Sequence, residues 1–203
     1  QRGPHAVLGG YTFMARRTAE AIARRLGNAL VAPVLPFSPA GSHLNPQWPG
    51  SVDLPPQLYA QVNAAVVASM VTNGFRNIIL MGDHGGGQEE LEKLARTLDA
   101  QYAPQGAHVY FCGSVYKKAR EDFNAWLKQH QLPVGSHASI PDTSELMYLG
   151  GEGFVRQDRL VAGRPDNGIV GDPRPSSPAL GKQVFDMKVD YGVEEIRRLV
   201  AGP

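Results

Sequence analysis

The chain has 203 residues, of which 42% are hydrophobic and 19% charged, so it is long and apolar enough to form one folded domain with a core. Lysine and arginine number 20 and aspartate and glutamate 19, and a formal charge of +1 gives no general attraction to nucleic acid or to an anionic membrane. The single cysteine, Cys112, excludes an intramolecular disulfide and a cysteine-based zinc cluster.

The first ten residues show neither a helical nor a strand pattern. We expect one domain over residues 1–203 that lacks its first strand at the N-terminus. The first residues show no basic or apolar leader pattern, and a signal peptide before Gln1 is neither shown nor excluded. The compartment therefore stays open between the cytoplasm and, if a signal peptide preceded Gln1, the periplasm or the exterior.

Apolar residues recur at helical spacing in some segments and form short continuous runs in others. In chain order these patterns predict a helix over Thr12–Leu26, a strand over Ala29–Leu35, a proline-rich loop over Pro36–Pro56, a helix over Gln57–Thr72, a strand over Asn77–Met81, a helix over Glu89–Leu98, a strand over His108–Cys112, and helices over Val115–His130, Asp142–Leu149, Ser177–Val189 and Val193–Ala201.

Strands and helices alternate over most of this length, which is typical of a parallel sheet covered by helices on both faces. The run Asn77–Met81 is apolar throughout, and this predicts a central strand buried on both faces. Ligands in such sheets bind beyond the carboxyl ends of the strands. We therefore expect functional residues in the loops that follow the strands.

A glycine-rich turn, Gly82–Gln88, follows the predicted central strand. Glycines let the backbone approach a ligand closely, and His84 in this turn could bind a metal or move a proton. Asp83 could be a second ligand or could orient the imidazole. A tight turn with a helix-capping aspartate is the alternative, and a phosphate loop lacks its Gly-Lys-Ser/Thr ending.

A second polar segment runs from His137 to Ser144, with Asp142 at the start of a predicted helix. A carboxylate there is stabilised by the helix N-terminus, so Asp142 is either a functional carboxylate or only an N-cap. His43, in the proline-rich loop, either reaches the crevice or lies on the surface. Cys112 has no neighbouring base in the sequence and fits an inert core thiol.

Five segments in order resemble the creatininase (creatinine amidohydrolase) family, and together they cover nearly the whole chain. They are Gln1–His5, Trp48–Leu54, Gly82–Gly87, His137–Ser144 and Gly168–Pro173.

The resemblance implies a three-layer α/β/α sandwich with a mostly parallel central sheet, assembled as a homo-oligomer, often a hexamer. It implies a metal-dependent hydrolase that cleaves a cyclic amide or another non-peptide C–N bond of a small molecule, with Zn²⁺ or Mn²⁺ as cofactor. From these segments we predict three groups of site residues: metal ligands His5, Asp83 and His84; catalytic residues His137 and Asp142; and substrate-binding residues Arg2, Tyr11, Trp48, Gly85 and Gly86.

The sequence also departs from the family pattern at three positions. Arg2 stands where the family usually has a metal-binding histidine, Tyr11 where it has a metal-bridging aspartate, and Asp142 where it has a glutamate. These changes leave two interpretations open. One is a hydrolase with a single metal ion. The other is a metal-free member that binds a small molecule or a partner, with the Arg2 cation in place of the metal.

Overall fold

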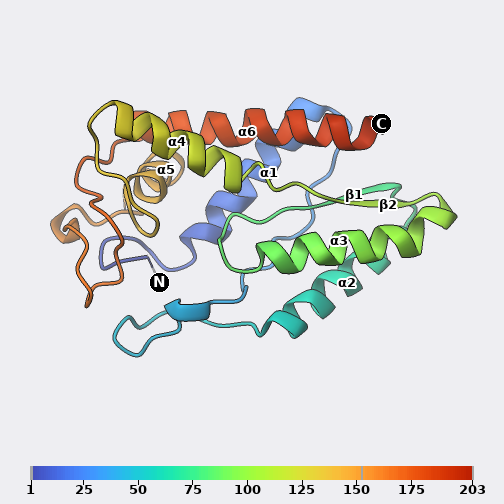
Figure 1. The fold of residues 1–203 in the computed structure, drawn as a ribbon, viewed down its shortest axis with the longest axis horizontal. Helices are drawn as coiled ribbons and strands as arrows, with labels where there is room; N and C mark the ends of the chain where they lie inside the picture. The colour runs from blue at the N-terminus through green and yellow to red at the C-terminus, as the bar shows by residue number, and fades with distance from the viewer. Residues whose placement is uncertain (1, 152, 203) are drawn as a thin grey trace.

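A computed structural model describes residues 2–151 and 153–202, so the part of the opening segment that falls on Gln1 lies outside the described residues. Figure 1 shows the arrangement of the elements. In chain order they are α1 (Gly10–Leu26), η1 (Gly41–His43), α2 (Pro56–Thr72), β1 (Asn77–Leu80), α3 (Gln88–Tyr102), η2 (Ala103–Gln105), β2 (His108–Phe111), α4 (Lys117–Gln129), α5 (Ile140–Gly150), η3 (Gln157–Arg159) and α6 (Pro178–Ala201).

The strands lie between two layers of helices, as the alternating pattern predicts. In Figure 1, α1, α4 and α6 lie on one side of the strands and α2 and α3 on the other. Each side has its own apolar cluster. Ile22, Val115 and Val193 belong to the first, and Val67 and Leu98 to the second. The predicted α/β architecture is confirmed.

The sheet is smaller than the sequence predicts. Strands β1 and β2 pair in parallel with Asn77 opposite His108 and Leu80 opposite Phe111, and they form a two-stranded sheet. The expectation of a central strand buried on both faces is therefore wrong for the described residues, because β1 has one strand neighbour and its last three residues are only half-buried.

The apolar run 29–35 forms no strand. Its residue Leu30 is 82% exposed. Pro33 lies inside the run and Pro36 directly after it, and proline lacks the N–H that a strand needs for its ladder. The apolar composition was thus a misleading signal in this segment.

The helices follow their predictions closely except at the C-terminus, where one helix replaces the expected two. Helix α6 runs unbroken for 24 residues through Gly192. A Cβ at Gly192 would lie 2.6 Å from the Ile22 side chain, so the absent side chain lets α6 pack directly against α1. The glycine serves close packing and does not end the helix. Within residues 2–151 and 153–202, no helix is both long and apolar enough to cross a membrane.

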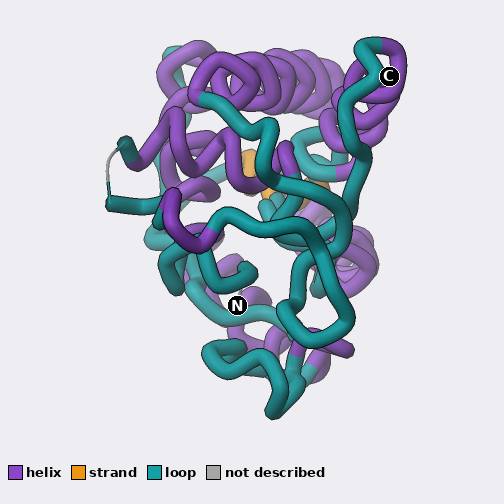
Figure 2. The backbone as a smooth tube through the Cα atoms, turned by 90° about the vertical axis from the view of Figure 1, so that its left-hand side faces the viewer, coloured by secondary structure: helices purple, strands orange, loops and turns teal. Residues whose placement is uncertain are grey.

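Long loops gather on one side of the molecule, beyond the carboxyl ends of the strands. Figure 2 looks onto this side, where loops surround the N-terminal residues. Backbone hydrogen bonds hold the start of the chain there, from Val7 N–H to the Phe154 carbonyl and from Arg156 N–H to the His5 carbonyl. Segments far apart in the sequence therefore meet at this end of the fold, where the candidate site lies.

Candidate functional site

The glycine-rich turn after β1 holds His84 in a fixed orientation. The Gly86 N–H donates to His84 Nδ1 at 3.1 Å, and the Ser38 hydroxyl lies 3.1 Å from the same nitrogen. The Gly86 carbonyl also lies near Nδ1 but farther away, at 3.4 Å, so the shorter contact with the N–H assigns Nδ1 as the acceptor and places the proton of the neutral ring on Nε2. Burial lowers the pKa of His84, so the ring is neutral near pH 7. His84 thus offers an Nε2–H donor.

The glycines of this turn are required by close approach of the proline-rich loop. A Cβ at Gly86 would lie 1.9 Å from the Pro39 carbonyl oxygen, and one at Gly85 would lie 2.8 Å from the Tyr116 hydroxyl. No side chain fits at either position without a shift of its neighbour. The predicted substrate-binding role of Gly85 and Gly86 stays a prediction. In the structure, their missing side chains make room for the Tyr116 hydroxyl and the Pro39 carbonyl.

His137 is oriented in the opposite sense. Its Nδ1 donates to the Gly168 carbonyl at 2.6 Å, which leaves the lone pair on Nε2. Burial lowers the pKa of His137 to about 4, so this ring is also neutral near pH 7. His137 therefore offers a proton acceptor where His84 offers a donor.

His43 connects these two histidines. Its ring stacks on His137 with 4.1 Å between centroids and lies 6.5 Å from the ring of His84. The separation of His84 and His137 can therefore be no greater than these two distances together. That limit is below about 12 Å, the distance beyond which two groups can no longer act on one small molecule. Of the two sequence interpretations of His43, the structure supports the one in which it reaches the other site residues, since its ring lies against His137 and near His84.

Asp142 lies at the centre of a cluster of cations. Arg120 NH1 lies 3.2 Å and Arg2 NH2 3.5 Å from its Oδ1, while Oδ2 accepts from the Ala138 N–H at 2.8 Å and from the Tyr11 hydroxyl at 3.3 Å. Burial alone would raise the pKa of Asp142. The Arg120 and Arg2 guanidiniums outweigh it and hold the pKa well below its ordinary range. Asp142 is thus a permanent, fully satisfied anion near neutral pH.

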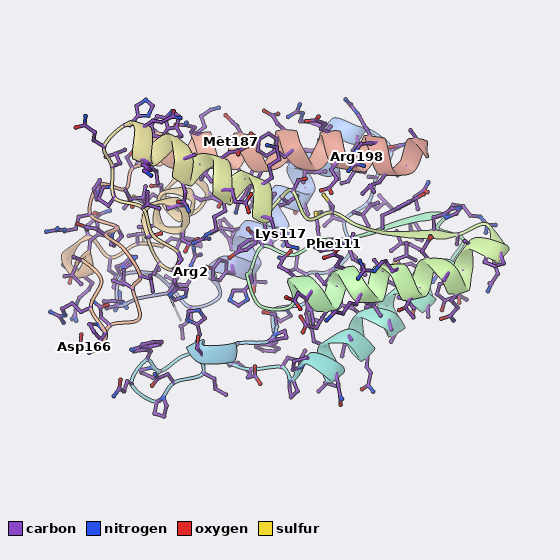
Figure 3. All side chains as sticks on the ribbon, viewed as in Figure 1. Arg2, Phe111, Lys117, Asp166, Met187 and Arg198 are labelled. Atoms are coloured by element: carbon purple, nitrogen blue, oxygen red, sulfur yellow. The ribbon has the colours of Figure 1, made fainter. Side chains whose placement is uncertain are left out.

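Arg2 and Tyr11 form one unit beside this carboxylate. The Arg2 guanidinium stacks 3.8 Å from the centroid of the Tyr11 ring, and the Tyr11 ring contacts His84 edge-on at 5.1 Å. Figure 3 places Arg2 inside the loop-rich half of the molecule, inward from Asp166 at its margin. Arg2 and Tyr11 therefore link Asp142 with the histidines.

Asp83 lines a small cavity together with Asp142 and Arg120, but its carboxylate is bound by a different buried cation. Its Oδ1 accepts from the Lys188 ammonium at 2.6 Å, and the same ammonium lies 2.6 Å from Glu145 Oε2. All three side chains are buried. Burial would lower the pKa of Lys188, but the two carboxylates outweigh it and raise the pKa. Asp83 is therefore engaged by a cation of the protein itself.

The donor set does not fit the metal that the resemblance implies. Asp83 is held by Lys188, and His5 Nε2 lies 2.9 Å from the Thr143 hydroxyl in a fully buried position. Across residues 2–151 and 153–202, no three histidine, cysteine, aspartate or glutamate side chains are placed to hold a metal ion together. The implied ligands His5, Asp83 and His84 thus form no common coordination site here.

Several site residues were not predicted. Arg120, Lys188 and Glu145 lie on helices where the sequence shows only ordinary surface periodicity, and Arg120 also donates to the Ser136 carbonyl. Their partners are distant in the chain, which is why no local motif marks them. Of the predicted residues, Trp48 lies 6.4 Å from the ring of His43, at the edge of the histidine group.

The structure also shows whether Asp142 is only an N-cap and whether Cys112 is a core thiol. Asp142 is the third residue of α5, whose N-cap is Ser139, and its carboxylate reaches back to the Ala138 N–H. It therefore stabilises the helix start as well as binding the arginines, but is not itself the N-cap. Cys112 is buried, and burial raises the pKa of its thiol, as expected of an inert core residue.

Known structures share this architecture. A crystal structure of creatinine amidohydrolase (creatininase) matches with a TM-score of 0.82 at 16% identity, covering 97% of this chain and 85% of that one. A mutant creatininase of the Zn–Zn type and a mutant creatininase complexed with creatine each match with a TM-score of 0.76 at 18% identity. They cover 97% of this chain and 85% and 86% of their own. The fold is thus the three-layer α/β/α fold of the creatininases.

The sequence comparisons agree with the fold. The family model for creatinine amidohydrolase matches residues 1–196, and the chain belongs to the creatininase family. A relative, the mycofactocin precursor peptide peptidase of Mycobacterium ulcerans (strain Agy99), is 25% identical over 230 residues that span all of this chain and 83% of that protein. Members of the family are metal-dependent amidohydrolases, and membership places this chain among the hydrolases.

Proposed function

We propose that the chain hydrolyses a C–N bond of a small molecule, with a cyclic amide as the leading substrate class. The observation that carries this proposal is the pairing of two neutral histidines with opposite tautomers, His84 as donor and His137 as acceptor, joined through His43. General acid–base catalysis needs one group of each kind beside the reacting carbonyl.

The proposed reaction uses these two rings in sequence. His137 Nε2 takes a proton from water as the water oxygen attacks the amide carbon, and the carbonyl oxygen receives a hydrogen bond from His84 Nε2–H. The tetrahedral carbon then expels the nitrogen, and protonated His137 delivers the same proton to that nitrogen. Gly168 keeps the Nδ1 proton of His137 in place, so the ring returns to its starting tautomer.

Asp142 and its arginines supply the electrostatic setting. Arg2 occupies the position where the resemblance expects a metal ligand, and its guanidinium brings a fixed positive charge there. We propose that this positive charge, without a metal ion, stabilises the negative charge that develops on the carbonyl oxygen in the transition state. Asp142 holds the guanidinium in place; the catalytic role assigned to it from the sequence becomes a role through Arg2.

The test begins with protein treated with chelator and shown by elemental analysis to be free of metal. A panel of small cyclic amides, linear amides and short peptides is then assayed for release of amine. We expect turnover of one amide class, and a loss of roughly 10²–10⁴-fold on His137→Ala. His130→Gln is the matched control. It replaces an exposed histidine whose ring stacks on Trp126, and the rate of amine release should equal that of the wild-type protein. Turnover that appears only after Zn²⁺ or Mn²⁺ is restored would contradict the proposal.

A second candidate function is the binding of a small molecule without its hydrolysis. The hydrogen-bond donors of the Arg2 guanidinium favour it. Arg2 is 3% exposed, and among the residues that the structure describes its Nε has no hydrogen-bond partner. A buried guanidinium with a spare donor suits a small carboxylate ligand. Calorimetric titration with small carboxylates distinguishes the two: saturable binding that Arg2→Gln abolishes, with no amide turnover by the wild-type protein, favours the binding function.

We also propose a homo-oligomer, as the resemblance implies. Apolar side chains are exposed along α2 and the loop before it, with Leu44 56%, Val52 59%, Leu58 45% and Val66 44% exposed. Several large apolar side chains exposed on one helix and the loop before it are consistent with a contact between subunits. The proline-rich loop that carries His43 would then lie at or near the interface.

A further inference from the structure

Lys188 is the most completely buried cation of α6. Its side chain is 9% exposed, and its ammonium donates to Asp83 and to Glu145 at 2.6 Å each. The three residues come from three elements: the turn after β1, helix α5 and helix α6. One ammonium therefore connects the glycine-rich turn to the helix that carries Asp142.

The position of this ammonium constrains both of its partners. A buried ammonium is costly unless oxygen atoms replace its water, and each buried carboxylate needs a donor in return. Charge-assisted hydrogen bonds of this length are short and directional. Displacing either carboxylate would leave buried charge without a partner, so the turn and α5 are held at a fixed spacing.

The turn itself has a second attachment that acts only on its backbone. Gln88 Nε2 donates to the carbonyls of Gly82 and His84 at 2.9 and 2.7 Å. These bonds fix the main chain on both sides of Asp83. The Asp83 side chain, directly before His84, is then fixed by Lys188. On α5, Glu145 lies one turn after Asp142 and shares a face with it.

We propose that Lys188 is a positioning residue for His84. By holding Asp83 against α5, it keeps the turn in the conformation in which the Gly86 N–H meets His84 Nδ1, and so keeps the Nε2–H of His84 available as a donor. This inference rests on the proposed function, in which that donor binds the substrate carbonyl.

The first test reads the tautomer of His84 directly, without substrate. In ¹⁵N NMR spectra near pH 7, we expect His84 of the wild-type protein in the Nε2–H form and His137 in the Nδ1–H form. Lys188→Met keeps a long unbranched side chain and removes the positive charge. We expect it to turn His84 into a mixture of tautomers while His137 stays unchanged, because Gly168 still holds it.

Two further variants complete the test. Asp83→Ala removes the same contact from the other side and leaves Lys188 paired with Glu145, so it should reproduce the change at His84 even if Lys188→Met does not fold. Lys182→Met removes an exposed ion pair with Asp186 on the same helix, 59% and 49% exposed, and should leave both tautomers as in the wild type.

The kinetic reading separates positioning from general stability. On the substrate that the amide panel identifies, folded Lys188→Met and Asp83→Ala should lose roughly tenfold or more in kcat with little change in KM, since the donor acts in the transition state. A folded variant of either kind that keeps the pure Nε2–H tautomer of His84 overturns the proposal. Failure of the proposed function would look different: no amide turnover by the wild-type protein, with the His84 tautomers still responding to Lys188.

Discussion

Replacing the buried histidine His5 should remove part of the acid sensitivity of the protein. Burial, with a smaller effect of Arg2, lowers the pKa of His5 to about 4 from an ordinary value of 6.5. The unfolded chain therefore binds a proton at this residue between those two values while the folded chain does not. The stabilising contribution is complete above pH 6.5 and is lost as the pH falls toward 4.

The magnitude follows from the two pKa values. Integrating the linkage relation from pH 7 to pH 5 gives a loss of about 2 kcal/mol in unfolding free energy from this single side chain, which is fully buried. His5→Gln removes the titration but keeps a donor for the Thr143 hydroxyl. The variant should therefore lose about 2 kcal/mol less than the wild type over the same interval.

Urea unfolding of both proteins at pH 7 and pH 5 measures this difference. Comparing the two changes cancels any effect of the substitution that does not depend on pH. His130→Gln, at an exposed histidine, serves as the control and should behave as the wild type. An equal loss in His5→Gln and the wild type would refute the assignment of acid sensitivity to this buried ring.

Three further predictions concern the site and the assembly. Gly86→Ala should lower the unfolding free energy by about 1–3 kcal/mol, measured in urea, because its Cβ would meet the Pro39 carbonyl; wild-type stability would contradict this. Asp142→Asn should cost about 3–5 kcal/mol by the same measurement, because it leaves Arg2 and Arg120 without their buried counter-ion; a neutral effect would show that the arginines find other partners. Leu58→Glu should dissociate the proposed oligomer in light scattering, and a wild-type protein found only as a 21.9 kDa species would remove the premise.

Local sequence signals predicted most of the helices and the position of the glycine-rich turn. The apolar spacing of Thr12–Leu26 reflects the burial of one face against neighbouring elements, and the helix forms. Gln57–Thr72 also forms a helix, although Leu58 and Val66 of its apolar pattern are exposed. The same reasoning failed for residues 29–35, where prolines prevent strand pairing, and at Gly192, where tight packing against α1 uses a glycine inside a helix. Composition alone cannot separate these cases.

The site was only partly predictable because most of its energetics depends on distant partners. The order of motifs pointed to His84, His137 and Asp142. Neighbours in the sequence explain the backbone contacts of His84 with Gly86 and of Asp142 with Ala138, whereas His137 binds the distant carbonyl of Gly168. Lys188 is 105 residues from Asp83, and nothing in its local sequence distinguishes it from an exposed helix lysine. The sequence assigned Asp83 to a metal, whereas the structure pairs it with this lysine.

The tautomers of the site histidines, too, are beyond sequence reasoning. They depend on whether Nδ1 meets an N–H, as at His84 beside Gly86, or a carbonyl, as at His137 beside Gly168. Only the folded backbone decides this. It also sets which ring donates and which accepts in the proposed reaction.

The central claim is that two neutral histidines, with Arg2 in place of a metal charge, carry out amide hydrolysis. The most direct measurement is the rate of amine release by metal-free wild-type protein and by metal-free His137→Ala, with metal content determined in the same samples. The account predicts turnover by the wild-type protein and a loss of roughly 10²–10⁴-fold in the variant. An inactive metal-free wild type that regains turnover in proportion to bound Zn²⁺ or Mn²⁺ would contradict it.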